Sequence, residues 1–372
     1  MFGLYIHIPF CERKCSYCAF YSVVSPSTEL RTGKGWKKTE QFFQALEKEM
    51  ARLPAGFAPA TIFIGGGTPT APDFQTLEKF FSAFAKAMAD RPKFGKFQPK
   101  EFSVEVNPGT VDEAKLSLLK RSGVNRLSIG VQSFDFQCLE TLGRIHSAEQ
   151  AEEAFRLARA AGFENISIDL MFGTPGQTFA MLDADLERAI ALGPEHIAIY
   201  NLMYEQGTPL VERDPVRLDE ELEREMYDHI RARLKVAGFV HYEISNFAKP
   251  GFECRHNLLY WTGGEYIGCG PSAHSHWNGT RWANVADLDD YCANGPRHEF
   301  EETLDPDAQE RETLVMGLRL LEGVEVSSNV WKKQAEIFHC LAKEGLLVIE
   351  GRRVRLSEEA LFISDTVFSE LI

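Results

Sequence analysis

Residues 4–18 of the chain read LYIHIPFCERKCSYC, an apolar run followed at once by three cysteines. The run Leu4–Phe10 is rich in Ile, Tyr and Phe, which strands favour. Three closely spaced cysteines indicate a metal-binding loop with reduced thiols, because disulfide frameworks usually belong to short secreted chains. The stretch therefore predicts a strand that carries a metal-binding loop at its end.

Further strand-like runs and helical patterns alternate along the first two thirds of the chain. The runs are Thr61–Gly65, Phe102–Val106, Arg126–Val131, Ile166–Met171 and His196–Leu202. Between them, apolar residues recur at helical spacings of three and four in Thr39–Ala51, Asp73–Met88, Glu149–Ala161, Met181–Leu192 and Leu218–Ala237. Repeated strand–helix units imply parallel strands with right-handed crossovers. We therefore expect residues 1–237 to form an α/β domain, an open, partial TIM-like barrel of six βα units.

The unusual residues follow the ends of these strands. The cysteines follow the first run, Gly65–Pro69 the second, Asn107–Gly109 the third, Gln132 the fourth and Phe172–Gly176 the fifth. Ligands of βα barrels lie at the C-terminal ends of the strands. These residues are therefore expected to share one rim.

The remainder of the chain differs in composition and in sequence pattern. Residues 238–304 are rich in Gly, Asn, His, Tyr and Trp and are expected to form a connecting region. Residues 305–372 are mostly helical by pattern and end in a helix–turn–hairpin order, which predicts a small C-terminal α+β domain similar to a winged helix. No basic recognition helix is visible there, so a structural or lid role is favoured over DNA binding.

The composition is that of an ordinary globular protein of 372 residues, with a formal net charge of −14. This charge argues against a general nucleic-acid binder, whose affinity rests on phosphate neutralisation. No apolar stretch approaches the ~20 residues of a membrane span, and the N-terminal run lacks the basic lead of a secretory signal. We therefore expect a cytoplasmic protein.

Cys11, Cys15 and Cys18 have the spacing Cys-x3-Cys-x2-Cys. A closed 4Fe–4S site usually has four thiolates, so three would hold three irons and leave the fourth open. The alternative, zinc, usually needs two cysteine pairs or added histidines. The other five cysteines are scattered and are interpreted as small buried residues: Cys138, Cys254, Cys269, Cys292 and Cys340.

The run Tyr5–Cys18 resembles the opening motif of the radical SAM superfamily. The resemblance implies that the barrel is a radical SAM core and that the open iron binds the amino and carboxylate groups of S-adenosylmethionine (SAM). Electron transfer from the cluster can then break a sulfonium bond to give a deoxyadenosyl radical. The cofactor carries that chemistry, and the protein orients it and excludes water.

Several residues are candidates for the SAM site. Gly66 and Gly67 let the backbone approach a ligand, and free N–H groups there can bind the methionine carboxylate, with Thr68 adding a hydroxyl. Glu105 suits the methionine ammonium by charge, although a structural ion pair is an alternative. The resemblance adds five residues: Tyr5, Tyr17 near the adenine, Gln132, Arg144, which could equally brace a carboxylate, and Asp169 for the ribose hydroxyls.

Longer motifs resemble the HemN/HemW group of this superfamily, which contains oxygen-independent coproporphyrinogen III oxidases and haem chaperones. They are residues 125–134 (NRLSIGVQSF), 168–178 (IDLMFGTPGQT) and 242–248 (YEISNFA), and the resemblance extends from Tyr5 to about Leu356. Three features favour the chaperones. Cys11 comes almost at once, whereas the oxidases usually carry an N-terminal extension; Phe20 stands where they have a fourth cysteine; and residues 256–261 (HNLLYW) match a motif typical of the chaperones.

This last motif suits haem chemically. A neutral imidazole such as His256 is a common axial ligand of haem iron, and Tyr260 and Trp261 offer flat apolar faces. The alternative is a structural loop in which His256 caps the backbone and the aromatic rings pack in a core. Cys254, His274 and His276 are other candidate ligands.

Three functions follow from the resemblance. The favoured one is a chaperone that binds haem as cargo and delivers it to acceptor haemoproteins such as membrane-bound respiratory cytochromes, with SAM and the cluster tuning the transfer. The alternatives are a coproporphyrinogen III oxidase of porphyrin biosynthesis and another radical SAM reaction. Whether the chain is an enzyme is left open, and the resemblance also allows a homodimer.

Overall fold

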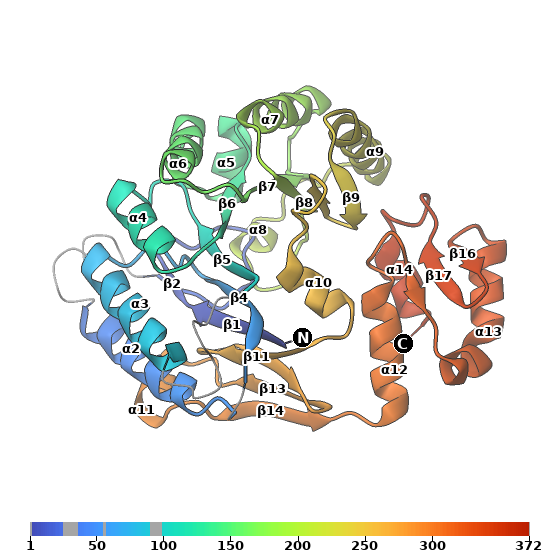
Figure 1. Cartoon of the computed structure of the whole chain (residues 1–372). Coiled ribbons are helices and arrows are strands. Elements are labelled where there is room, and N and C mark those ends of the chain that lie inside the picture. Colours follow the sequence, from blue (N-terminus) through green and yellow to red (C-terminus); the bar gives the residue numbers. More distant parts are fainter. Residues whose placement is uncertain (1, 25–35, 55–56, 90–98, 372) are drawn as a thin grey trace.

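The computed structural model of the chain describes residues 2–24, 36–54, 57–89 and 99–371. One twelve-stranded sheet forms its frame (Figure 1). Seven parallel strands make up the centre, in the order β11-β1-β4-β5-β6-β7-β8. Their bounds are β11 Glu265–Cys269, β1 Phe2–Ile8, β4 Pro59–Gly66, β5 Glu101–Val106, β6 Arg126–Gln132, β7 Ile166–Phe172 and β8 His196–Asn201.

Antiparallel strands extend both edges of this sheet. They are β10 (Asn246–Ala248) and β9 (Val240–Glu243) beside β8, and β12 (His274–Trp277), β13 (Thr280–Asn284) and β14 (His298–Thr303) beside β11. The outermost strands β9 and β14 do not pair with each other in the described chain, so the barrel is open. This confirms the predicted partial barrel of six βα units.

Two details differ from the expectation. The first strand ends at Ile8, because Pro9 has no N–H to donate to a ladder; Phe10 begins the short strand β2 (Phe10–Cys11), which pairs with β3 (Val23–Val24). The sheet also gains a seventh parallel strand, β11, from the region 238–304. That region therefore contributes strands to both edges of the sheet.

Helices cover the outer face of the parallel strands (Figure 1). Each presents one apolar stripe to the sheet, as Phe80 and Phe84 of α3 do, and this burial holds the layers together. The helices on this face include α2 Trp36–Ala51, α3 Phe74–Ala89, α4 Glu113–Arg121, α6 Ala148–Ala160, α7 Phe179–Leu192 and α9 Glu220–Val236; further short helices of the chain are α5 Phe136–Leu142, α8 Pro209–Glu212, α10 Arg255–Trp261 and α11 Leu288–Asn294.

The C-terminal part packs beside β9 and α9 (Figure 1). It comprises α12 Pro306–Gly317, α13 Ser328–Lys343, α14 Ser364–Ser369 and a small sheet of β15 Val324–Glu325, β17 Arg353–Leu356 and β16 Leu347–Glu350. Backbone hydrogen bonds join it to the barrel, from Ile244 N to Arg319 O (3.2 Å) and from Leu321 N to Tyr242 O (3.1 Å).

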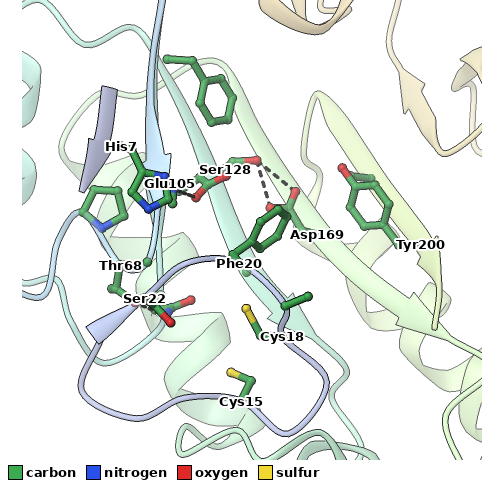
Figure 2. Close-up of a pocket in the computed structure, with 18 of the residues that line it drawn as sticks. His7, Cys15, Cys18, Phe20, Ser22, Thr68, Glu105, Ser128, Asp169 and Tyr200 are labelled. Atoms are coloured by element: carbon green, nitrogen blue, oxygen red, sulfur yellow. Dashed lines mark hydrogen bonds between the residues drawn. The ribbon is translucent and has the colours of Figure 1, made fainter. Parts of the chain in front are cut away.

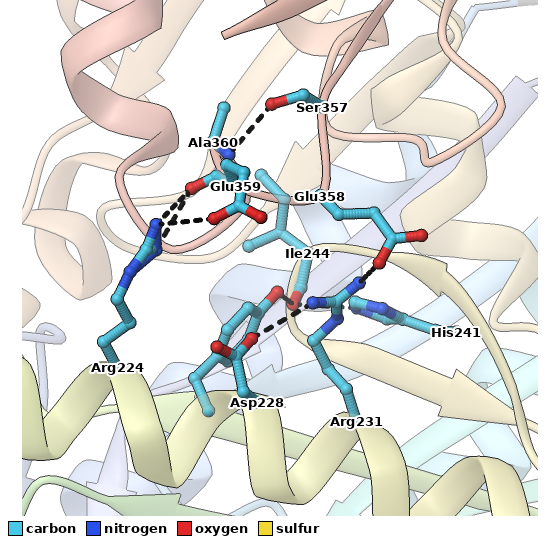
Figure 3. A network of polar contacts seen from close by, with 10 residues as sticks. Arg224, Asp228, Arg231, His241, Ile244, Ser357, Glu358, Glu359 and Ala360 are labelled. Carbon is cyan, nitrogen blue, oxygen red and sulfur yellow. Dashed lines mark hydrogen bonds and ion pairs between the residues drawn. The ribbon is translucent and has the colours of Figure 1, made fainter. Parts of the chain in front are cut away.

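Polar contacts from α9 reinforce this docking. Figure 3 shows Arg224 donating to the Glu359 carbonyl and Arg231 reaching the Glu358 carboxylate at 3.2 Å. Both acidic side chains are exposed, so the buried apolar contacts beneath them carry most of the stability. None of the described helices is long and apolar enough to cross a membrane.

Candidate functional site

A cavity of about 950 Å³ runs inside the barrel. Side chains of each strand point alternately to the two faces of the sheet, and every second one faces the cavity. On β6 these are Arg126, Ser128, Gly130 and Gln132, while the residues between them pack against the helices. All fifteen candidate residues line it, namely Cys11, Cys15, Cys18, Tyr5, Tyr17, Gly66, Gly67, Thr68, Glu105, Gln132, Arg144, Asp169, His256, Tyr260 and Trp261. Its volume is near the upper end of the ~300–1,000 Å³ typical of small-molecule sites.

The cysteine loop is anchored at the C-terminal ends of the strands. Ser16 fixes its middle: its N–H donates to Leu142 O (3.0 Å), its hydroxyl donates to Thr141 O (2.6 Å), and its carbonyl accepts from Leu210 N (2.8 Å). His7 holds the loop's far end through Tyr21 O at 2.9 Å. All three cysteines are partly exposed to the cavity; Figure 2 shows Cys15 and Cys18 on the loop beneath Phe20.

A chain of hydrogen bonds links two of the cysteines across the rim. Arg144 donates to Cys15 Sγ (3.4 Å) and to Asn107 Oδ1 (2.7 Å). Asn107 donates to the Thr68 hydroxyl (2.7 Å), and Thr68 donates to Cys11 Sγ (3.6 Å). Donors aimed at sulfur stabilise thiolates, as metal ligation requires. The sequence predicted Asn107 at the rim from its place just after the third strand, but it gave no role for the side chain.

The candidate metal ligands at the rim are three thiols. Within the described ranges, no group of three or more His, Cys, Asp or Glu side chains is arranged to hold one metal ion. The three thiols nevertheless line one cavity and act on one another electrostatically. Burial raises the pKa of the Cys11 and Cys18 thiols, and the neighbouring cysteines raise it further. Positive charge among the three sulfurs would offset this penalty.

The glycine turn packs tightly against the strand that leads to the cysteine loop. Gly66 has φ +108°, and a Cβ on Gly67 would lie 2.7 Å from the Pro9 carbonyl carbon. The prediction that N–H groups here are free for a carboxylate is wrong. Gly66 N donates to Glu105, Gly67 N to Ile8 O and Thr68 N to Phe10 O. The glycines thus join β4 to the cysteine loop and leave the Thr68 side chain facing the cavity.

Two acidic residues face the cavity from strands on either side of β6, Glu105 from β5 and Asp169 from β7. The pKa of Glu105 is raised to about 8, mainly by burial and then by the charge of Asp169, while the hydrogen bond from the Gly66 N–H opposes the rise. The Asp169 carboxylate accepts hydroxyl hydrogen bonds from Ser128 (3.0 Å) and Ser167 (2.8 Å), as Figure 2 shows for Ser128. Burial also raises the pKa of Asp169. Such carboxyls are suited to a ligand that brings a positive charge.

The other residues expected at SAM surround this end of the cavity. Gln132 ends β6 at φ +66°, which is strained backbone for a residue with a side chain, beside a register shift against β7. Tyr5 OH contacts His7 Nδ1 at 3.0 Å. Burial lowers the pKa of His7 to about 4, so its ring is neutral and Tyr5 donates to it. Tyr17 packs on the apolar cluster of Leu142, Met171, Leu202 and Leu210.

The motif at residues 256–261 lies at the opposite end of the barrel. It forms α10, whose N–H groups at Arg255 (2.8 Å) and His256 (3.0 Å) donate to Glu101, the first residue of β5. Gly3, near the start of β1, lets the helix approach, since a Cβ there would lie 2.5 Å from Leu259. Helix α10 therefore closes the end of the cavity formed by the N-terminal ends of the strands.

Both ring nitrogens of His256 are engaged within the protein. Nδ1 lies 2.9 Å from Thr61 Oγ1 and Nε2 lies 2.7 Å from Tyr260 OH, while the ring stacks on Phe63. The side chain is 1% exposed. Burial, reinforced by Arg126, lowers the pKa of His256 to about 3, so the imidazole is neutral. Of the other candidates, Cys254 and His274 line the cavity, with Cys254 buried and His274 exposed.

Comparisons with known proteins agree with this architecture. The family model of the Radical SAM superfamily matches residues 5–189. The chain is 35% identical to the haem chaperone HemW of Bacillus subtilis, over 100% of this chain and 99% of that protein. It is 39% identical to HemW of Escherichia coli over 73% of this chain and 69% of that protein.

The chain belongs to the HemW family of the radical SAM superfamily. Among solved structures, it is similar to coproporphyrinogen III oxidase (HemN) of Escherichia coli, with a TM-score of 0.82 over 100% of this chain and 89% of that chain. The sequence identity to that structure is 22%, so this likeness describes the fold that the HemW family shares with it. Membership of the superfamily implies a 4Fe–4S cluster and SAM.

Proposed function

We propose that this chain is a haem chaperone that holds haem in the barrel cavity and passes it to acceptor haemoproteins. The observation that carries the proposal is full-length similarity to proteins named haem chaperones, together with one cavity lined by all the candidate residues. The likeness to the oxidase rests on fold alone and favours no second function.

At the rim, Cys11, Cys15 and Cys18 would hold the 4Fe–4S cluster. When bound, the cluster and SAM supply one-electron chemistry at a sulfonium. The chain's own residues would orient these groups: Arg144 and Thr68 donate to cysteine sulfurs, and Glu105 faces the methionine ammonium. Gly66 and Gly67, Tyr5, Tyr17, Gln132 and Asp169 would complete the SAM site, with Asp169 placed for hydroxyl groups.

Haem would enter where the cavity opens beside exposed apolar side chains. Phe20 is 70% exposed and Met203 60% exposed, and both line the cavity. His256 would be the axial ligand after Tyr260 OH releases its Nε2. The release leaves the buried Tyr260 hydroxyl without this partner, at a cost of about 1–3 kcal/mol, and the neutral imidazole is the ligating form. Tyr260 and Trp261 would then contact the porphyrin.

The acceptors we propose are respiratory cytochromes at the membrane. A cytoplasmic location suits cluster ligands that must stay reduced, and Cys11, Cys15 and Cys18 are free thiols in the structure. A homodimer remains a prediction that sedimentation of the cluster-loaded protein would check.

Haem titration of the anaerobically reconstituted protein tests the proposal. We expect wild type to give a Soret band on haem binding. The haem affinity obtained from this band should fall at least tenfold in His256→Ala, while the exposed control His339→Ala should bind haem as wild type does. Incubation with SAM, reductant and coproporphyrinogen III should give no protoporphyrinogen at enzyme-like rates. Such turnover would overturn the chaperone proposal, and unchanged haem binding in His256→Ala would overturn the ligand assignment.

A further inference from the structure

Arg126 is a buried cation with two nitrogen atoms that no described residue contacts through a hydrogen bond. It is the first residue of β6, is 2% exposed and lines the cavity. Its Nε and Nη1 atoms are buried and have no hydrogen-bond partner among the residues that the structure describes. A guanidinium presents five donors and stays charged, so burial without partners is strongly unfavourable. The structure therefore provides a strong donor that faces an open space.

The two carboxylates that act most strongly on Arg126 accept their hydrogen bonds from other groups. Glu101 accepts from Arg255 N and His256 N and from the Cys254 thiol. Asp169 accepts from Ser128 and Ser167 with both of its oxygens. These carboxylates act on Arg126 through space, but their hydrogen bonds stabilise α10 and the strand wall. They leave the guanidinium available to a group that enters the cavity.

Arg126 lies far from the cysteine end. Gln132 ends the same strand at the rim, and six residues of strand span roughly 20 Å. His256 shares the Arg126 end of the cavity, since the guanidinium acts on its imidazole electrostatically and Glu101 lies near both. A ligand group on Arg126 is therefore separate from groups bound beside the cysteines.

We propose that the Arg126 guanidinium binds a carboxylate of a ligand held in the cavity. Arginine pairs with carboxylates through two parallel hydrogen bonds, and its geometry and charge suit such a partner. The source favoured here is a propionate of haem, and this part of the inference rests on the proposed function. The other source with the same chemistry is the carboxylate of SAM, which would have to lie at the Arg126 end of the cavity instead of beside the cysteines.

Spectroscopic titration with haem and with haem dimethyl ester, and calorimetry with SAM, distinguish these sources. The variants are Arg126→Gln, Arg126→Lys and the control Arg188→Gln, whose guanidinium is paired with Glu152 at the surface. We expect wild type and the control to bind haem at least tenfold more tightly than its ester. Arg126→Gln should bind both equally, and Arg126→Lys should keep part of the preference because it keeps the charge.

The outcomes separate the inference from the proposed function. If Arg126→Gln instead weakens SAM at least tenfold, the carboxylate belongs to SAM and the site stands. If Arg126→Gln and Arg126→Lys bind all three ligands as wild type does, the carboxylate site is refuted. If wild type binds no haem, the proposed function fails, while the SAM titration still decides whether Arg126 binds a carboxylate. The melting temperature is also compared without ligand. If Arg126→Gln melts no lower than wild type, Arg126 serves a ligand site and is not a structural ion pair.

Discussion

Glu105 offers a sharp test of how the cavity receives SAM. Burial raises the pKa of this carboxyl to about 8, and one hydrogen bond from Gly66 N (3.1 Å) lowers it only in part. With that pKa, the carboxyl carries about 0.9 of a proton at pH 7. If the methionine ammonium lies against it, the ion pair favours the carboxylate and the proton leaves.

The perturbation is Glu105→Gln, which keeps the shape and removes the titration. Calorimetry of SAM binding at pH 7, repeated in buffers of different ionisation enthalpy, gives the number of protons released. We expect wild type to release about 0.9 proton more than Glu105→Gln. Any proton lost from the SAM amine on binding iron is common to both proteins and cancels in this difference. Equal release by the two proteins would refute the assignment of Glu105 to the ammonium.

The raised pKa of Glu105 also predicts that the stability of the protein without SAM depends on pH. The pKa is higher in the folded state, so the folded protein binds more protons and its free energy of unfolding falls as pH rises above about 4.5 and levels off above about 8. Between pH 4.5 and 7 the fall from this group is roughly 3 kcal/mol. Denaturation by urea at both pH values should show a shallower fall in Glu105→Gln, and an identical fall would contradict the burial argument.

Three further predictions concern the frame of the site. Replacing Cys11, Cys15 or Cys18 singly by Ala should remove most iron from the reconstituted protein. The control Cys340→Ala, at an exposed site, should retain the iron. Iron analysis of each variant checks this, and wild-type iron content in any of the three loop variants would contradict the assignment of that cysteine. Glu101→Gln weakens the charged acceptor at the start of α10 and should lower the free energy of unfolding by roughly 1.5–3 kcal/mol, as measured by urea denaturation. An unchanged free energy of unfolding would refute the capping role of Glu101. Gly67→Ala places a Cβ 2.7 Å from the Pro9 backbone and should weaken SAM binding at least tenfold by calorimetry; wild-type affinity would show that the close approach is unimportant.

Much of the barrel could be predicted from the sequence because its signals are local. Each of the six expected runs forms a strand. A short apolar run between two helical patterns has few other structures that it can adopt. The seventh parallel strand, β11, was missed because it pairs in parallel with β1, more than two hundred residues earlier. No local pattern encodes such a pairing.

The candidate residues were found by motif, and what escaped prediction is how their atoms are engaged. The glycine turn suggested free N–H groups, yet parallel pairing and Glu105 take them up. Asn107 carries no motif of its own and acquires its place from Thr68 and Arg144. Hydrogen bonds between separate strands depend on register and rotamers, which only the folded chain defines.

The position of His256 was equally hidden. In sequence it stands beyond the barrel, yet α10 folds back onto the first residues of β4 and β5 and closes the end away from the cysteines. The structure thus separates the two groups of candidates by the length of the strands. One cavity nevertheless joins them, which is the basis for a haem site that cluster and SAM can influence.

The central claim is that three cysteines hold a cluster with one iron left open for SAM. Electron paramagnetic resonance of the reduced, reconstituted protein tests it most directly. We expect the cluster signal to change when SAM is added to wild type, because a new ligand reaches the iron that no cysteine holds. Spectra that are identical with and without saturating SAM would contradict the account.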